Sequence, residues 1–217
     1  MQSAHRETNS SQAGFTLVEI AIVLVVIGLL LGGILKGQEM VVQARAKNVI
    51  ADIHGLTAAH YAYQDRYRAP PGDDPGAGRW SGTMPGTGDG TVAGDYNSAV
   101  NNSESRLWWD HLRRSGFVAG SGQQQPLNAV SGMLGVQTGM GTGTGTALGG
   151  FAALIMCSAN LPDKIAVAID AQLDDGNPAS GTVRAQQQTA VNQSVANASA
   201  SSYQETGTNV YVLCRQI

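Results

Sequence analysis

Apolar residues fill one continuous segment near the start of the chain. From Phe15 to Leu35 the only charged side chain is Glu19, and almost every other residue is apolar. A helix rises about 1.5 Å per residue, so roughly 21 residues cover about 30 Å, the thickness of a bilayer core. The pattern predicts a membrane-spanning helix. Its single carboxylate is a functional candidate, because an acid inside such a segment costs roughly 2.5–3.5 kcal/mol.

Beyond this segment the helical periodicity continues as a narrower stripe. Its members recur at alternating intervals of four and three positions: Val42, Ala46, Val49, Ile53, Leu56, His60, Tyr63 and Tyr67, widened on one side by Ile50, Thr57 and Tyr61. Such a stripe predicts a helix with one buried face, which packs either on a sheet or against another helix as a coiled coil. Pro70 and Pro71 end the helix.

The remainder of the chain is rich in turn residues and contains short regular segments. We expect helices at 103–114 and 162–173, strands at 151–157, 182–185 and 209–215, and loops at 70–102, 119–150 and 186–206. A long helix first and strands last predict an α+β fold, with a small antiparallel sheet packed on the long helix. The expected parts are a leader (1–14), a membrane half of the helix (15–36), an amphipathic half (37–68) and a loop-rich head (69–217).

The composition and motifs of the chain argue against several classes of function. The net charge is −3 and the isoelectric point is about 5.7, which argues against a nucleic-acid-binding surface. His54, His60 and His111 lack metal-ligand spacing, and we find neither a phosphate-binding loop nor a nucleophile with a paired base. The sequence therefore favours a structural or binding protein over an enzyme.

The junction before the apolar segment has a recognisable order. A short polar leader ends in Gly14, Phe15 follows, and Glu19 lies four residues further on. A secretory signal is cleaved after its apolar core, whereas this junction precedes it. The arrangement resembles the prepilin signature of type IV pilins and type II secretion pseudopilins. The resemblance implies cleavage after Gly14, N-methylation of Phe15 and assembly of a filament through the N-terminal helix.

The resemblance also implies partners and a location. These are a prepilin peptidase, homologous pilin or pseudopilin subunits and an assembly platform in the bacterial inner membrane, with the head in the periplasm before assembly. In the family, the glutamate at the position of Glu19 pairs with the N-terminal amine of a neighbouring subunit, and the resemblance implies the same role for Glu19. The alternative is that the Glu19 side chain only extends to the lipid headgroups. At the level of the whole protein, the alternative is a single-span anchored extracytoplasmic binding domain that does not polymerise.

Orientation and cysteine chemistry depend on this resemblance. The basic residues Lys36, Arg45 and Lys47 would by themselves place the head in the cytoplasm, whereas the family places it outside. An extracytoplasmic head with two cysteines predicts a Cys157–Cys214 disulfide, and two buried free thiols are the alternative.

Acidic residues in glycine-rich loops are candidates for calcium. Asp73, Asp74, Asp89 and Asp95 offer hard oxygen ligands, but no full calcium-loop spacing is present and Asp-Gly pairs are common in turns. We therefore expect no cofactor, with calcium at these four residues as the alternative. Asp174 and Asp175 precede Gly176 and are interpreted as the end of a helix.

Overall fold

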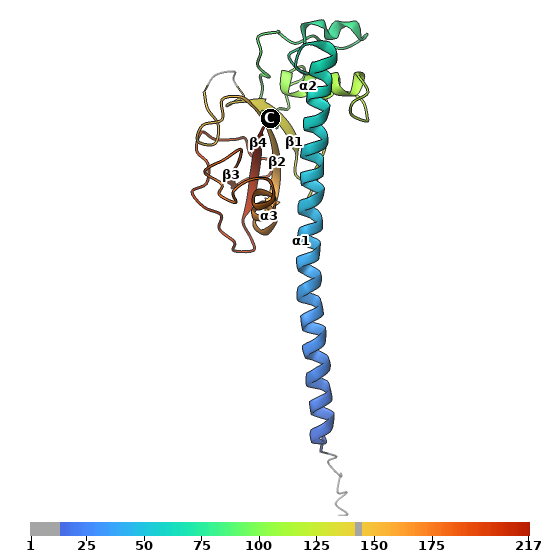
Figure 1. Ribbon diagram of the computed structural model, residues 1–217, viewed down its shortest axis with the longest axis vertical. Coiled ribbons are helices and arrows are strands. Elements are labelled where there is room, and N and C mark those ends of the chain that lie inside the picture. Colours follow the sequence, from blue (N-terminus) through green and yellow to red (C-terminus); the bar gives the residue numbers. More distant parts are fainter. Residues whose placement is uncertain (1–13, 142–144) are drawn as a thin grey trace, which may run out of the picture. The chain divides into compact units, whose positions relative to one another are not determined.

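The computed structural model describes residues 14–141 and 145–217, which form two compact units divided between Val41 and Val42. Helix α1, Leu17–Tyr67, has 51 residues and contributes to both units (Figure 1). The expected single long helix is confirmed, and it ends before the two prolines as predicted. The leader, apart from Gly14, lies outside the described residues. The expected domain boundaries at residues 36 and 68 stay predictions.

The described part of the first unit is the apolar start of α1. Its large side chains, from Phe15 through Leu35, are all 47–85% exposed within the chain. This segment is long and apolar enough to cross a membrane, by length and composition.

The second unit combines the remaining elements around one antiparallel sheet. In chain order these are the 3₁₀ helix η1 (Pro75–Arg79), α2 (Glu104–Arg114), β1 (Leu134–Thr138), β2 (Leu154–Pro162), α3 (Asp163–Leu173), β3 (Val183–Gln188) and β4 (Val210–Gln216). The strand order is β1-β2-β4-β3, and every neighbouring pair is antiparallel. The predicted α+β class is confirmed.

Both faces of the sheet are covered. On one face, residues such as Val136, Met156 and Leu213 share a core with the C-terminal part of α1, with α2 and with α3. On the other face, Cys157, Val212 and Cys214 pack with loop residues that include Tyr96 and Phe151. Strand β4 is therefore buried on both sides, whereas its alternating sequence had predicted a half-buried strand.

The stripe along α1 packs on the sheet face as expected. Ala46, Val49 and Ile53 are fully buried in the core of the second unit, together with Leu134 and Met156. Within this chain, the packing favours the sheet over a coiled coil as the partner of the stripe. Tyr61 is 52% exposed, so its expected place at the edge of the stripe is wrong; the small Ala59 is buried instead.

Other corrections concern short elements. Strand β1 lies entirely inside 119–150, where a loop was expected, and β3 runs three residues beyond the expected strand 182–185 to Gln188. Strand β2 begins later and ends later than the predicted 151–157. Helix η1 lies within 70–102, where no regular element was expected, and Ser103 precedes α2 without capping it through its side chain.

Candidate functional site

The start of α1 brings together the residues of the predicted cleavage and assembly site. The Glu19 amide donates to Thr16 Oγ1 at 3.2 Å, while Glu19 Oε2 accepts from the Thr16 amide and from its hydroxyl, both at 2.8 Å. This reciprocal pair is a capping box, which satisfies backbone amides that the first helical turn leaves without partners. The Thr16–Glu19 spacing of a capping box is present in the sequence, but from the sequence Glu19 was assigned only to subunit pairing or to contact with the lipid headgroups.

The surroundings of this box are apolar and open. Phe15 is 83% exposed and Leu17 85% exposed, and Gly14 lies just before the helix without regular structure. A backbone that is exposed and outside regular structure is accessible to a peptidase. Both hydrogen bonds that the Glu19 carboxylate accepts from Thr16 go to Oε2, and among the described residues Oε1 of Glu19 accepts no hydrogen bond.

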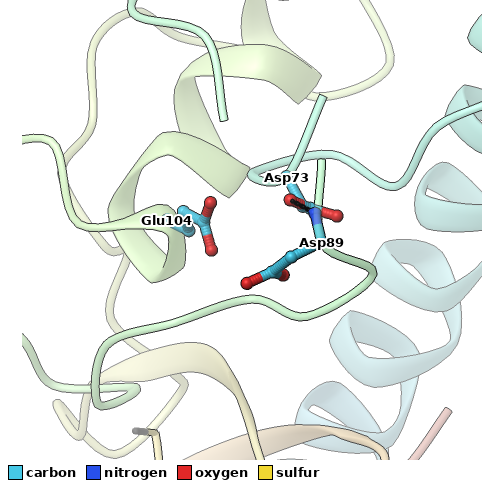
Figure 2. Close-up of side chains that lie close together, drawn as sticks. All are labelled: Asp73, Asp89 and Glu104. Carbon is cyan, nitrogen blue, oxygen red and sulfur yellow. Dashed lines mark hydrogen bonds between the residues drawn. The ribbon is translucent and has the colours of Figure 1, made fainter. Parts of the chain in front are cut away.

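Three acidic residues of the head lie together, as Figure 2 shows: Asp73, Asp89 and Glu104. Each offers a carboxylate oxygen within 4.8 Å of the other two. Sequence reasoning had proposed the two aspartates as calcium candidates but missed Glu104, which lies in the first turn of α2. A glutamate there is ordinarily explained by the helix dipole, so no sequence signal linked it to the loop.

Backbone amides already occupy these oxygens. Asp73 accepts from the amides of Gly88, Asp89 and Gly90, and Glu104 accepts from the amides of Thr87 and Ala93. The two buried carboxylates thus clamp the turn-rich segment to α2. Carboxylates with this many donors are stabilised without a cation, so the arrangement favours a structural role over a metal site.

The other two calcium candidates lie elsewhere. Asp74 forms an ion pair with Arg79 at 2.7 Å and accepts a 2.6 Å hydrogen bond from the Tyr63 hydroxyl. Burial alone would raise the pKa of Asp74, but the bonds from Arg79, Tyr63 and the Gly76 amide outweigh it and hold this pKa below its usual range. Asp95 accepts from Ser194 and is not part of the cluster.

The two cysteines form the predicted disulfide. Cys157 of β2 and Cys214 of β4 are directly opposite each other in the antiparallel register, and their bond joins residues 57 positions apart. Both side chains are fully buried. The last strand of the chain is thereby fixed to the centre of the sheet.

Two histidines stabilise the core of the head. The Trp108 indole donates to His60 Nδ1 at 3.3 Å, and the Gly72 amide donates to His111 Nδ1 at 2.9 Å. Burial lowers the pKa of His60 to about 4, and burial also lowers the pKa of His111. Both rings are therefore neutral at pH 7. These contacts fit the expected packing role, and His54 is exposed.

Comparison with known proteins identifies the N-terminal region. The family model for the prokaryotic N-terminal methylation motif matches residues 9–35. Neither the curated proteins nor the solved structures gave a match to the chain.

The motif and the fold together define a class. The chain carries a type IV pilin- or pseudopilin-type N-terminal signature on a pilin-like α+β architecture. The motif supports a type IV pilin-like prepilin, and the apolar start of α1 fits a membrane-anchored precursor.

Proposed function

We propose that this protein is a filament subunit of a type IV pilus or a type II secretion pseudopilus. In this proposal the precursor is cleaved between Gly14 and Phe15, Phe15 is N-methylated, and the mature chain assembles through the first part of α1. The observation that carries the proposal is the apolar, exposed start of α1 with Glu19 as its only charge before Lys36.

The exposed apolar surface favours burial by other chains. Residues 15–35 present an almost wholly apolar helix that the rest of the described chain does not cover. In the precursor a bilayer covers this surface. In a filament, the same segments of neighbouring subunits would cover one another, and the small residues Gly28, Gly32 and Gly33 would permit close helix approach.

Glu19 supplies a specific contact in this setting. Cleavage before Phe15 creates an amine that is positively charged at neutral pH. A carboxylate in apolar surroundings is strongly disfavoured unless it meets a cation or a hydrogen-bond donor. The capping box engages only Oε2. Oε1 can therefore receive the amine of a neighbouring subunit without loss of the cap, which would set the axial register between subunits.

Substitution of Glu19 can separate its two roles. Glu19→Gln keeps a side chain that serves in a capping box but removes the negative charge. Glu19→Ala removes both, and Thr16→Val removes the hydroxyl of the box while leaving the charge. We expect both Glu19 variants to enter filaments at least tenfold less than wild type, and Thr16→Val to fall much less. The measurement is the fraction of each variant recovered in sheared filaments from cells that also express wild-type subunits.

The outcomes distinguish the alternatives. Wild-type incorporation of Glu19→Gln would mean that capping, not charge pairing, is what assembly requires. Wild-type incorporation of Glu19→Ala would remove the assembly role and leave Glu19 reaching the headgroups. An intact disulfide in each variant controls for head folding. A protein that never appears in filaments, wild type included, would instead be a single-span anchored binding domain.

A further inference from the structure

An open cavity lies in the head between the C-terminal part of α1, helix α2 and the segment that follows α2. Its volume is about 370 Å³, which is within the range of small-molecule sites. All of its lining residues except Asp52 and Arg113 are apolar, aromatic or glycine, and they include Leu56, Trp109, Phe117 and Leu127. Apolar walls with a few polar groups are typical of sites that bind small organic molecules.

Gly55 leaves the cavity open on the side of α1. It lies in the interior of the helix, where glycine is less favourable than alanine. A Cβ at this position would meet no atom within 4 Å. Crowding inside the described chain therefore does not require a glycine here, and the space beside its backbone is available to a ligand.

Two N–H groups of α2 beside the cavity lack acceptors. Trp109 is fully buried, and neither its indole Nε1 nor Nε of Arg113 has a hydrogen-bond partner among the described residues. The two residues lie one helical turn apart, with the Arg113 guanidinium 5.5 Å from the centre of the Trp109 ring. Buried donors without acceptors are costly, so this side of the cavity favours an acceptor such as a carboxylate.

The two charged residues of the cavity do not pair with each other. Asp52 of α1 and Arg113 of α2 both line it, and neither takes part in an ion pair within the described part of the chain. Burial raises the pKa of Asp52, and burial lowers the pKa of Arg113 against the charge of Asp110. Each charge is thus partly desolvated without compensation. The carboxylate favours a cationic group and the guanidinium an anionic one.

We propose that this cavity binds a free amino acid with an apolar side chain. Its carboxylate would accept hydrogen bonds from Arg113 and Trp109, and its ammonium group would face Asp52. Its side chain would pack against Leu56 and Phe117. A carboxylate ligand without the amine would leave Asp52 without a counter-charge, and an amine without the carboxylate would leave both N–H donors without an acceptor. The site lies in the head and is independent of the proposed filament assembly.

Calorimetric titration of the full-length protein in detergent tests the site. The probe is L-phenylalanine, because its ring suits the aromatic lining. A titration to about 10 mM saturates a site whose dissociation constant is about 1 mM, and we expect one molecule per chain. Three analogues each lack one feature: 3-phenylpropionate lacks the ammonium group, 2-phenylethylamine lacks the carboxylate, and free glycine lacks the apolar side chain. Each should bind about tenfold more weakly or worse. Absence of phenylalanine binding, or equal binding of any analogue, would overturn the proposal.

A cavity-filling variant locates the ligand. Gly55→Leu places an apolar side chain in the cavity without displacing any atom at its Cβ, so the thermal unfolding midpoint should not fall. Phenylalanine binding should weaken by about tenfold or more. Gly37→Leu makes the same change on the same helix away from the cavity and should bind as wild type. Wild-type binding in Gly55→Leu would mean that phenylalanine binds elsewhere, which would overturn the proposal.

A charge variant tests the orientation of the ligand. Asp52→Asn should weaken the binding of phenylalanine but not that of 3-phenylpropionate, so the preference between these two ligands should disappear. Loss of structure alone would weaken both ligands. Asp65→Asn, at an exposed aspartate of the same helix, should keep the wild-type preference. An unchanged preference in Asp52→Asn would contradict the proposed contact between Asp52 and the ammonium group.

Discussion

The two parts of α1 are one helix with opposite environments. Before residue 42 its large apolar side chains are exposed within the chain, and after it the apolar side chains of the stripe pack against the sheet and α2. In the proposed function the same helical backbone serves two purposes: the first part offers its apolar surface to a membrane or to neighbouring subunits, and the second part packs in the core of the head. Substitutions should therefore affect head stability in one part and assembly in the other.

The largest effect on stability should come from a core residue of the packed part. Ile53 is fully buried, whereas Ile27 is 47% exposed. Ile53→Ala should lower the free energy of unfolding by roughly 2–5 kcal/mol, because it leaves a cavity that the sheet cannot fill. Urea denaturation in detergent, followed by the fluorescence of the buried Trp108 and Trp109, measures it.

Ile27→Ala is the matched control, with the same change in side-chain volume. We expect it to leave head unfolding unchanged. Equal losses in both variants would mean that the two parts of α1 do not differ in the way described.

The sheet on which the packed part rests depends on its disulfide. Replacement of Cys157 and Cys214 by serine removes a cross-link between residues 57 positions apart. The chain-entropy relation gives a loss of about 4 kcal/mol for a loop of that size. The same urea experiment tests it, and thiol labelling of unfolded, unreduced wild-type protein should find no free cysteine. An unchanged transition in the double-serine variant would contradict a stabilising role.

Acid should weaken the packed part through His60. Burial lowers the pKa of His60 to about 4 in the folded chain, against an ordinary value of 6.5. Between these two pH values the His60 imidazole is therefore protonated in the unfolded chain but neutral in the folded chain. Stability attributable to His60 is therefore complete above pH 6.5 and falls as the pH is lowered towards 4. At pH 5 the loss is on the order of 2 kcal/mol, and the lowered pKa of His111 acts in the same direction.

Unfolding measured at pH 7 and pH 5 checks this dependence. His60→Gln should reduce the difference between the two pH values, and substitution of the exposed His54 provides the control. An undiminished difference in His60→Gln would assign the acid sensitivity to other groups.

Sequence patterns predicted the long elements better than the short ones. The spacing along α1 and the run at Val210–Gln216 depend on many apolar residues, which only one periodicity fits. Strand β1 gave no such signal, because its sequence is Leu-Gly-Val-Gln-Thr inside a glycine-rich stretch. A Cβ at Gly135 would collide with the Tyr96 carbonyl oxygen, and the Gln137 side chain accepts from the Tyr96 amide. Both features depend on a distant loop that no local pattern reveals.

The candidate sites also differ in how well the sequence predicted them. Gly14, Phe15 and Glu19 lie within six consecutive residues, so their spacing could be recognised in the sequence. The carboxylate cluster of the head joins residues that are far apart, such as Asp73 with Glu104. A carboxylate can accept backbone amides, as Asp73 does, or line a cavity, as Asp52 does. Which of these occurs depends on tertiary contacts, and the sequence could not distinguish the two cases.

Intact-mass spectrometry of the protein purified from its native membranes is the sharpest test of processing at Gly14. We expect one mature species that begins at Phe15 with an N-methyl group. A Gly14→Val variant should remain as a precursor that retains the 14 leader residues, because the larger side chain obstructs cleavage. A native protein that retains its leader, or a Gly14→Val variant that matures normally, would contradict the account.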